Sequence, residues 1–346
     1  MTEAGAPPPR RRLAWLTPGR IAATGGLLLL IAAIVLWVAP ANGYQLQLVD
    51  PAHPVAPLVH LKGKRPRGPG AIYFVDVRER PARLIERLLP WARSEGSSLV
   101  HSPPISSSLD RRLGQVEMLD SQKIAPYVAL KLLGYHVSEQ NVGVSVLQVE
   151  NGAPAAKVLK PADVILAGDG RPVKTIADLH GVLGTKHPGD RLRIRFRRGN
   201  KIQEATITTT ASAVDRRQAI LGIFASDNLV VRLPVQVTID SQGIGGPSAG
   251  LAFALEILQE LGRNVAHGHK VAATGELNLD GRVLPIGGVK QKTLGARRAH
   301  VDAFLVPAGE NAQEARRYAD GLRIIPVENV QQALRALATL GPEASG

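Results

Sequence analysis

The hydrophobic positions of this chain follow three patterns in succession. Residues 21–38 form an uncharged apolar run, residues 134–210 alternate short strand-like stretches with turns, and residues 213–346 alternate apolar helical and strand-like stretches. A period of two indicates strands, and a period of about 3.6 residues indicates helices. We therefore expect an α+β chain of several domains, in which an N-terminal transmembrane helix precedes a β-rich module with helices and a C-terminal α/β domain.

Clusters of proline, glycine and charge divide these patterns further. Within residues 71–133 we expect a strand at 71–77, helices near 81–94 and 121–133, and a Ser/Pro-rich loop at 102–108. The predicted divisions are a basic cytoplasmic N-terminus at 1–20, a transmembrane signal anchor at 21–39, a tether at 40–70, an α/β segment at 71–133, the β-rich module at 134–212 and the C-terminal domain at 213–346.

Positive charge precedes the apolar run, at Arg10, Arg11, Arg12 and Arg20. A run of this length crosses a hydrocarbon core of ~30 Å at ~1.5 Å per residue. A cleaved signal peptide is the competing interpretation, but the run is long for one, and Trp37 lies where an interfacial anchor would. Because positive residues stay in the cytoplasm, we expect a single-pass protein of the cytoplasmic membrane, with its N-terminus inside and its C-terminal domain extracytoplasmic.

Composition narrows the classes of function. The net charge of +13 calls for an anionic neighbour, either a membrane or nucleic acid. A nucleic-acid partner is not expected, because the predicted topology places most of the chain outside and only 4% of the residues are aromatic. The chain has no cysteine, which excludes disulfides and thiolate chemistry. His267 and His269 are two potential ligands without a nearby carboxylate, so we predict no metal and no cofactor.

Residues 134–210 carry a series of segments that resembles a PDZ domain. The series comprises a strand at 142–150, the turn at 152–156, the run Ala162-Asp163-Val164-Ile165, a helix at 176–183 and a strand at 191–198. Ala162 departs from the family, which usually has glycine there. The resemblance implies a module that binds peptide C-termini at a strand edge and a nest of backbone amides.

Two features of this module allow alternative interpretations. Leu133, Gly134, Tyr135 and His136 resemble the carboxylate-binding loop, but they also fit an ordinary helix-to-strand turn with Gly134 as its left-handed cap. In the strand at 191–198, arginine at every second position predicts one buried face and one cationic face. That cationic face is either solvated or apposed to a membrane or an acidic substrate.

The segment after residue 213 carries the candidate chemistry. Gly243, Gly245 and Gly246 permit a backbone path on which amide N–H groups converge, as an oxyanion site requires. Ser248 then lies directly before the apolar helix expected at 249–261. Serine is also a preferred helix N-cap, so Ser248 alone does not distinguish capping from catalysis. Whether Ser248 is a cap or a nucleophile depends on whether the chain also supplies a base to accept its proton.

Two lysines of the helix that follows Gly287-Gly288 are candidates for that base. A base must be neutral to accept the serine proton, and burial disfavours the charged ammonium. Lys292 shares its helical face with Gly295, Ala296 and Ala299, a small apolar stripe that lets another element pack closely, whereas Lys290 shares its face with Thr293 and Arg297. We therefore expect Lys292 to be buried and Lys290 to be solvated.

Four blocks resemble the proteolytic domain of the Lon family, namely residues 246–250, 274–277, 281–292 and 301–307. The resemblance implies that Ser248 is the nucleophile, that Lys292 is the general base, and that the Thr274 hydroxyl helps orient the lysine. Gly245 and Gly246 then belong to the supporting oxyanion loop. The family often has an acidic residue where this chain has Gly245. We therefore do not expect an acidic side chain to regulate the oxyanion loop in this protein.

No Gly-x-x-x-x-Gly-Lys-Ser/Thr pattern occurs in the sequence, so coupling to ATP is not predicted. The combination of segments resembles the YlbL-type, membrane-anchored Lon-like proteins of Gram-positive bacteria. It implies an ATP-independent serine endopeptidase on the outer face of the cytoplasmic membrane, which cleaves unfolded or flexible envelope protein segments selected through the PDZ module. We also expect a homo-oligomer. The alternative is an inactive, membrane-tethered scaffold that binds peptides.

Overall fold

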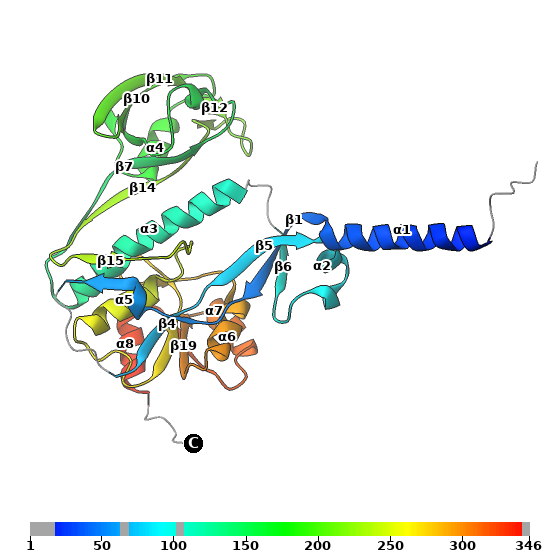
Figure 1. Cartoon of the computed structure of the whole chain (residues 1–346). Helices are drawn as coiled ribbons and strands as arrows, with labels where there is room; N and C mark the ends of the chain where they lie inside the picture. Colours follow the sequence, from blue (N-terminus) through cyan, green and yellow to red (C-terminus); the bar gives the residue numbers. More distant parts are fainter. Residues whose placement is uncertain (1–17, 63–68, 102–106, 341–346) are drawn as a thin grey trace, which may run out of the picture. The chain divides into compact units, whose positions relative to one another are not determined.

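The computed structural model describes residues 18–62, 69–101 and 107–340 (Figure 1). The chain divides into two compact units, residues 1–48 with 78–104, and residues 49–77 with 105–346. The first unit has a small core of its own around Leu46 and Ala82. The second unit contains the β-rich module and the C-terminal domain, which have separate cores.

The first unit is a three-stranded sheet with one long and one short helix. Helix α1 (Pro18–Val38) leads into strand β1 (Pro40–Val49), which pairs between β5 (Val77–Arg83) and β6 (Ser98–His101). The helix predicted at 81–94 is shorter than expected, because residues up to Arg83 belong to β5. It consists of α2 (Leu84–Leu88) and the 3₁₀ turn η2 (Pro90–Ala92), separated where Pro90 cannot donate a helical hydrogen bond.

Helix α1 presents apolar side chains to its surroundings, including Leu29, which is 74% exposed. Among residues 18–62, 69–101 and 107–340, no helix has both the length and the apolar character needed to cross a membrane. The transmembrane helix of the predicted fold class is therefore not supported.

The segment predicted as a tether contains regular structure. Besides β1, it forms β2 (His53–Pro54), the 3₁₀ turn η1 (Ala56–Leu58) and β3 (Val59–Leu61), and β3 pairs antiparallel with β15 (Val237–Ile239). Val55 and Val59 are fully buried in the core of the second unit. Hydrophobic burial thus orders a stretch whose prolines suggested a linker. Residues 63–68 of this segment lie outside the described residues.

The β-rich module is built on one antiparallel sheet in the order β11-β10-β8-β7-β14 (Figure 1). The exposure of β10 alternates as predicted, with Leu192, Ile194 and Phe196 buried and the intervening arginines outside. Strand β14 pairs with β7 over most of its length, so the boundary predicted at residue 212 leaves out one strand of this sheet. The elements are β7 (Ser138–Val149), η3 (Pro154–Lys157), β8 (Val164–Gly168), β9 (Arg171–Pro172), α4 (Ile176–Leu183), β10 (Arg191–Arg198), β11 (Lys201–Thr208), β12 (Thr210–Ala211), β13 (Ala219–Ile220) and β14 (Ile223–Arg232).

The C-terminal domain is a three-layer α/β structure. Its sheet has the order β2-β4-β16-β19-β20, in which the last four strands are parallel. Alternate residues serve opposite layers: Val271 and Ala273 pack with α3, α5 and α8, whereas Ala272 packs with α6 and α7. The elements are β4 (Ala71–Phe74), α3 (Ser107–Leu132), α5 (Gly250–Glu260), β16 (Lys270–Ala273), β17 (Glu276–Leu277), β18 (Val283–Leu284), α6 (Val289–Arg298), β19 (Ala303–Pro307), α7 (Glu310–Arg317), β20 (Arg323–Val327) and α8 (Val330–Ala338).

Helix α3 is much longer than the helix predicted at 121–133. It begins at Ser107, inside the stretch predicted as a Ser/Pro-rich loop, of which residues 102–106 lie outside the described part of the chain. The buried residues Met118, Tyr127 and Leu130 pack the helix onto the core that also contains α5. Tertiary packing therefore extends a helix whose polar first half has little helical periodicity.

Candidate active site

Ser248 immediately precedes the N-cap of α5. The N-cap position is occupied by Ala249, and no side chain caps the helix there. The Ser248 side chain is half-buried, and its helix is buried along its whole length. The capping alternative for Ser248 therefore has no support in the structure, and the hydroxyl remains a candidate nucleophile.

The backbone of Ser248 is held by the segment that follows β16. Its carbonyl accepts hydrogen bonds from the Gly275 amide at 2.8 Å and from the Thr274 hydroxyl at 3.1 Å. The Leu251 amide in turn donates to the Gly275 carbonyl at 3.0 Å. Gly275 has φ +152°, and a Cβ atom there would lie 2.4 Å from Val283 Cγ1, so glycine is required. These bonds fix the start of α5 against the carboxyl end of β16.

Lys292 lies in the first turns of α6, where its amide donates to the Gly288 carbonyl at 3.0 Å. Its side chain is only 4% exposed, as the face argument predicted. Lys290 is half-buried instead, and its Nζ lies 5.5 Å from the centroid of the Tyr318 ring. The two lysines therefore differ in burial in the predicted direction, whereas the role of Lys292 as a base stays a prediction.

The small face of α6 admits a neighbouring segment at very short range. The Ala52 amide donates to the Gly295 carbonyl at 3.2 Å, and a Cβ atom on Gly295 would lie 2.1 Å from the Asp50 carbonyl oxygen. A side chain of any size is thus excluded at Gly295 while this segment stays in place. The close approach positions the helix that carries Lys292.

The topology of the sheet brings both candidate residues to one edge. Helix α6 connects the parallel strands β16 and β19, so it runs back across the sheet and its first turn lies near the carboxyl end of β16. Ser248 is bonded to Thr274 and Gly275 at that same end. In open α/β sheets, sites form at the carboxyl ends of the strands. Thr274 is fully buried at this end of β16, where its hydroxyl donates to the Ser248 carbonyl and its amide donates to the Leu305 carbonyl of β19.

The glycine-rich loop before Ser248 is covered by helix α3. The Gly246 amide donates to the Gly114 carbonyl at 2.7 Å, and the Ser121 hydroxyl donates to the Pro247 carbonyl at 3.0 Å. A Cβ atom on Gly245 would lie 3.3 Å from the Gly114 carbonyl carbon, so the two backbones are nearly in contact. The Gly246 amide is therefore occupied in this structure. It can serve an oxyanion only when the bond to α3 is released.

A carboxyl group with a shifted pKa lies next to Thr274 and Gly275. Burial raises the pKa of Glu276 above its usual value, since desolvation penalises the carboxylate. Glu276 falls within the block 274–277 that resembles the Lon family, but no role was predicted for it from the sequence. Such a shift is typical of groups near functional sites, although structural burial produces it too.

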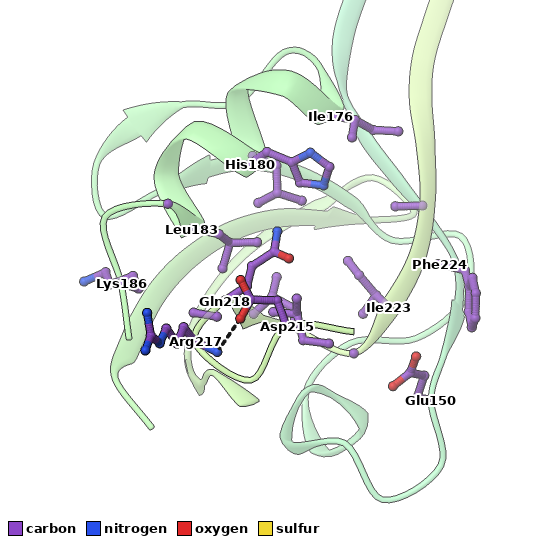
Figure 2. A pocket seen from close by; sticks show the side chains of 17 residues that line it. Glu150, Ile176, His180, Leu183, Lys186, Asp215, Arg217, Gln218, Ile223 and Phe224 are labelled. Atoms are coloured by element: carbon purple, nitrogen blue, oxygen red, sulfur yellow. Dashed lines mark hydrogen bonds between the residues drawn. The ribbon is translucent and has the colours of Figure 1, made fainter. Parts of the chain in front are cut away.

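A cavity of 530 Å³ lies in the β-rich module, between α4 and the start of β14 (Figure 2). Figure 2 shows Ile176, His180 and Leu183 along α4 on one side and Ile223 on β14 on the other. The α4 residues are spaced by four and three, which places them on one helical face. Within the described residues β14 is the last strand of its sheet, so one of its edges is unpaired, and its first residues, 223–225, line the cavity. The other residues that line the cavity include Glu150, Leu179, Lys186, Asp215, Arg217, Gln218, Leu221 and Gly222.

The predicted carboxylate-binding residues are not among those that line this cavity. Gly134 has φ +81°, and the Tyr135 amide donates to the Leu130 carbonyl at 3.0 Å, which is the bonding of a left-handed helix cap. Leu133 packs on the core of the C-terminal domain, and His136 precedes β7. The structure thus matches the alternative of a helix-to-strand turn. Leu221 and Gly222, which do line the cavity, were assigned to the C-terminal domain from the sequence.

Three potential metal ligands approach one another elsewhere. Ligand atoms of Asp50, His53 and Asp76 lie within 4.8 Å of one another, and His53 Nε2 is 3.4 Å from the Asp50 carboxylate. Acidic groups at a surface often gather without an ion, so we assign no metal to them. His269 is buried, and its Nδ1 lies 3.5 Å from the Asp302 carboxylate, so the expectation that no carboxylate lies near the histidine pair is wrong for His269. Among the described residues neither His267 nor His269 belongs to a group of three potential ligands.

The structure thus joins a β-rich module with a cavity to an α/β domain with a candidate serine site. Residues 198–339 match the family model of the Lon protease (S16) C-terminal proteolytic domain, and residues 131–209 match that of the PDZ domain. The chain therefore combines a PDZ domain with a proteolytic domain of the Lon (S16) type, which is a serine peptidase family.

Individual proteins are similar to parts of this chain. The chain is 42% identical over 106 residues to Lon protease 1 of Myxococcus xanthus, which covers 29% of this chain and 13% of that protein. It is 35% identical over 151 residues to the Lon protease of Azorhizobium caulinodans, which covers 41% of this chain and 17% of the relative. It is also 30% identical to the PDZ domain of an SdrC-like protein from Listeria monocytogenes, over 24% of this chain and 87% of that chain, with a TM-score of 0.23.

The chain thus spans less than a fifth of the length of these Lon proteases. What the relatives share with it is the proteolytic domain.

Proposed function

We propose that this protein is an ATP-independent serine endopeptidase in which Ser248 and Lys292 form a catalytic dyad. The observation that carries the proposal is the burial of Lys292, at 4% exposure, on the helix whose first turn lies at the end of β16 where Ser248 is held. A buried ammonium is disfavoured, and a neutral amine accepts a proton from a serine hydroxyl.

The proposed reaction uses this chain's own groups. Lys292 removes the Ser248 proton as the hydroxyl oxygen attacks the scissile carbonyl, and backbone amides near the serine stabilise the oxyanion. Lys292 then passes the proton to the leaving amine. A water molecule, deprotonated by the same lysine, hydrolyses the acyl-enzyme and regenerates the serine. Thr274 acts as a positioning residue, because its hydroxyl holds the Ser248 carbonyl.

We further propose that the PDZ module selects substrates. The cavity between α4 and β14 has an apolar wall and an open strand edge, which suits an extended peptide added beside β14. Because the sequence lacks an ATP-binding pattern, the substrate must already be extended, as in unfolded or flexible envelope segments. Attachment to the outer face of the cytoplasmic membrane and assembly into a homo-oligomer belong to the same proposal.

The test is turnover of an unfolded protein by the full-length chain, with Ser248→Ala, Lys292→Met and the matched control Lys290→Met. We expect each dyad variant to lose activity by about 100-fold or more, whereas the control keeps most of it. Addition of ATP should leave the parent rate unchanged. Equal turnover by all four proteins would refute the dyad. An inactive parent that still binds C-terminal peptides would instead favour a peptide-binding scaffold.

A further inference from the structure

Four exposed apolar side chains lie at the junction of α1 with α2 and η2. Trp37 is 57% exposed, Leu88 60%, Leu89 36% and Trp91 76%. We call these four residues the interfacial patch. A single exposed leucine needs no explanation, but a group of large apolar side chains beside an exposed apolar helix marks a docking surface.

The elements that carry the patch contact one another within the first unit. The Leu84 amide donates to the Ala39 carbonyl at 2.9 Å, which ties the start of α2 to the end of α1. The Arg83 guanidinium lies 5.7 Å from the Trp37 ring centroid, in a cation–π arrangement. The two tryptophans are therefore presented by elements that contact each other.

The charge around the patch is cationic. Residues 78–95 contain five arginines and three glutamates. Glu86 is buried, and the Nη1 and Nη2 atoms of Arg80 donate to its carboxylate, which lowers the pKa of Glu86. The negative charge of Glu86 is thus paired with Arg80 inside the first unit. Arg83 and Arg87 are exposed on the same segment as Leu88 and Leu89, and the Arg87 guanidinium lies 4.5 Å from the Tyr44 ring centroid.

We propose that the interfacial patch docks into the headgroup region of an anionic membrane, with Trp37, Leu88, Leu89 and Trp91 inserted and Arg83 and Arg87 on lipid phosphates. Tryptophan favours this depth, and arginine adds attraction to anionic lipids. The neighbouring apolar side chains of α1, such as Leu28 and Leu29, need an apolar cover as well, which a membrane supplies and a small protein groove does not. The inference rests on the proposed membrane attachment and names its surface. It does not require α1 to cross the bilayer.

The test uses full-length chains with a single tryptophan, mixed with vesicles of phosphatidylcholine and phosphatidylglycerol that carry brominated acyl chains. The Trp91 reporter carries Trp15→Phe and Trp37→Phe, and the Trp37 reporter carries Trp15→Phe and Trp91→Phe. We expect Trp91 emission to shift to shorter wavelength and to lose most of its intensity on brominated vesicles. Leu88→Gln with Leu89→Gln should restore that intensity, and Arg83→Gln with Arg87→Gln should weaken binding when phosphatidylglycerol is present.

The two reporters separate the failure of this inference from the failure of membrane attachment. Quenching of Trp37 without quenching of Trp91 would leave attachment intact and overturn the interfacial patch. Quenching of neither would overturn attachment and the patch together. A short-wavelength Trp91 emission without vesicles would mean that protein covers the side chain, which also overturns the proposal. Far-UV circular dichroism of each reporter variant verifies that it is folded.

Discussion

Gly295 offers the most direct test of how α6 is positioned. In an open helix, glycine-to-alanine substitution stabilises by ~1 kcal/mol. Here the new Cβ would lie 2.1 Å from the Asp50 carbonyl oxygen, a backbone atom that cannot rotate away. Overpacking costs ~1–3 kcal/mol, and loss of the bond from the Ala52 amide costs about 1 kcal/mol more. The combined cost of overpacking and of the lost hydrogen bond exceeds the ~1 kcal/mol gained in helix propensity. Gly295→Ala should therefore lower the free energy of unfolding by about 1–3 kcal/mol.

Gly181 provides the matched control. It also lies inside a helix, α4, but a Cβ there has no atom within 4 Å, so Gly181→Ala should stabilise by up to ~1 kcal/mol. Urea unfolding followed by circular dichroism measures both changes, and hydrogen exchange locates them. For Gly295→Ala we expect faster exchange in α6 and lower turnover, because the helix that carries Lys292 must shift. Equal stabilisation by the two substitutions would refute the close approach.

Two further predictions concern single residues. Ala162 has φ +72°, so Ala162→Gly should relieve ~1–2 kcal/mol of left-handed strain against an entropic cost of ~0.4–1 kcal/mol, and a lower urea midpoint would contradict this. Burial raises the pKa of Glu276 above 4.5, so its ionisation lowers stability as pH rises from that value through the raised pKa. Glu276→Gln should therefore raise the melting temperature at neutral pH but not in acid; an equal effect at both would contradict the shift.

Local sequence patterns correctly predicted those elements whose hydrophobic periodicity is visible over their whole length. Helix α4 and strand β10 occur at the predicted residues, because each has a clear buried face over its whole length. The distinction between Lys290 and Lys292 succeeded for the same reason, since burial of a helical residue follows from its neighbours three and four positions away.

The failures arise where distant residues decide the structure. Val59 is buried where β3 pairs with β15, and the Val55 amide donates to the Ile72 carbonyl of β4; no local sequence pattern predicts either long-range contact. Leu221 and Gly222 line the PDZ cavity because β14 returns to pair with β7. From the sequence, the same residues were predicted to lie near the start of the C-terminal domain. Ala162 is instructive as well: the departure from glycine was visible, but its meaning required the backbone angle.

The contact between α3 and the glycine loop has a mechanical consequence for catalysis. Helix α3 ends at a left-handed turn that leads directly into β7, the central partner of β14 in the PDZ sheet. Its Gly114 carbonyl holds the Gly246 amide, and its Ser121 hydroxyl holds the Pro247 carbonyl next to Ser248. A shift of α3 thus changes the loop beside the candidate nucleophile Ser248. An oxyanion that needs the Gly246 amide therefore needs α3 to move.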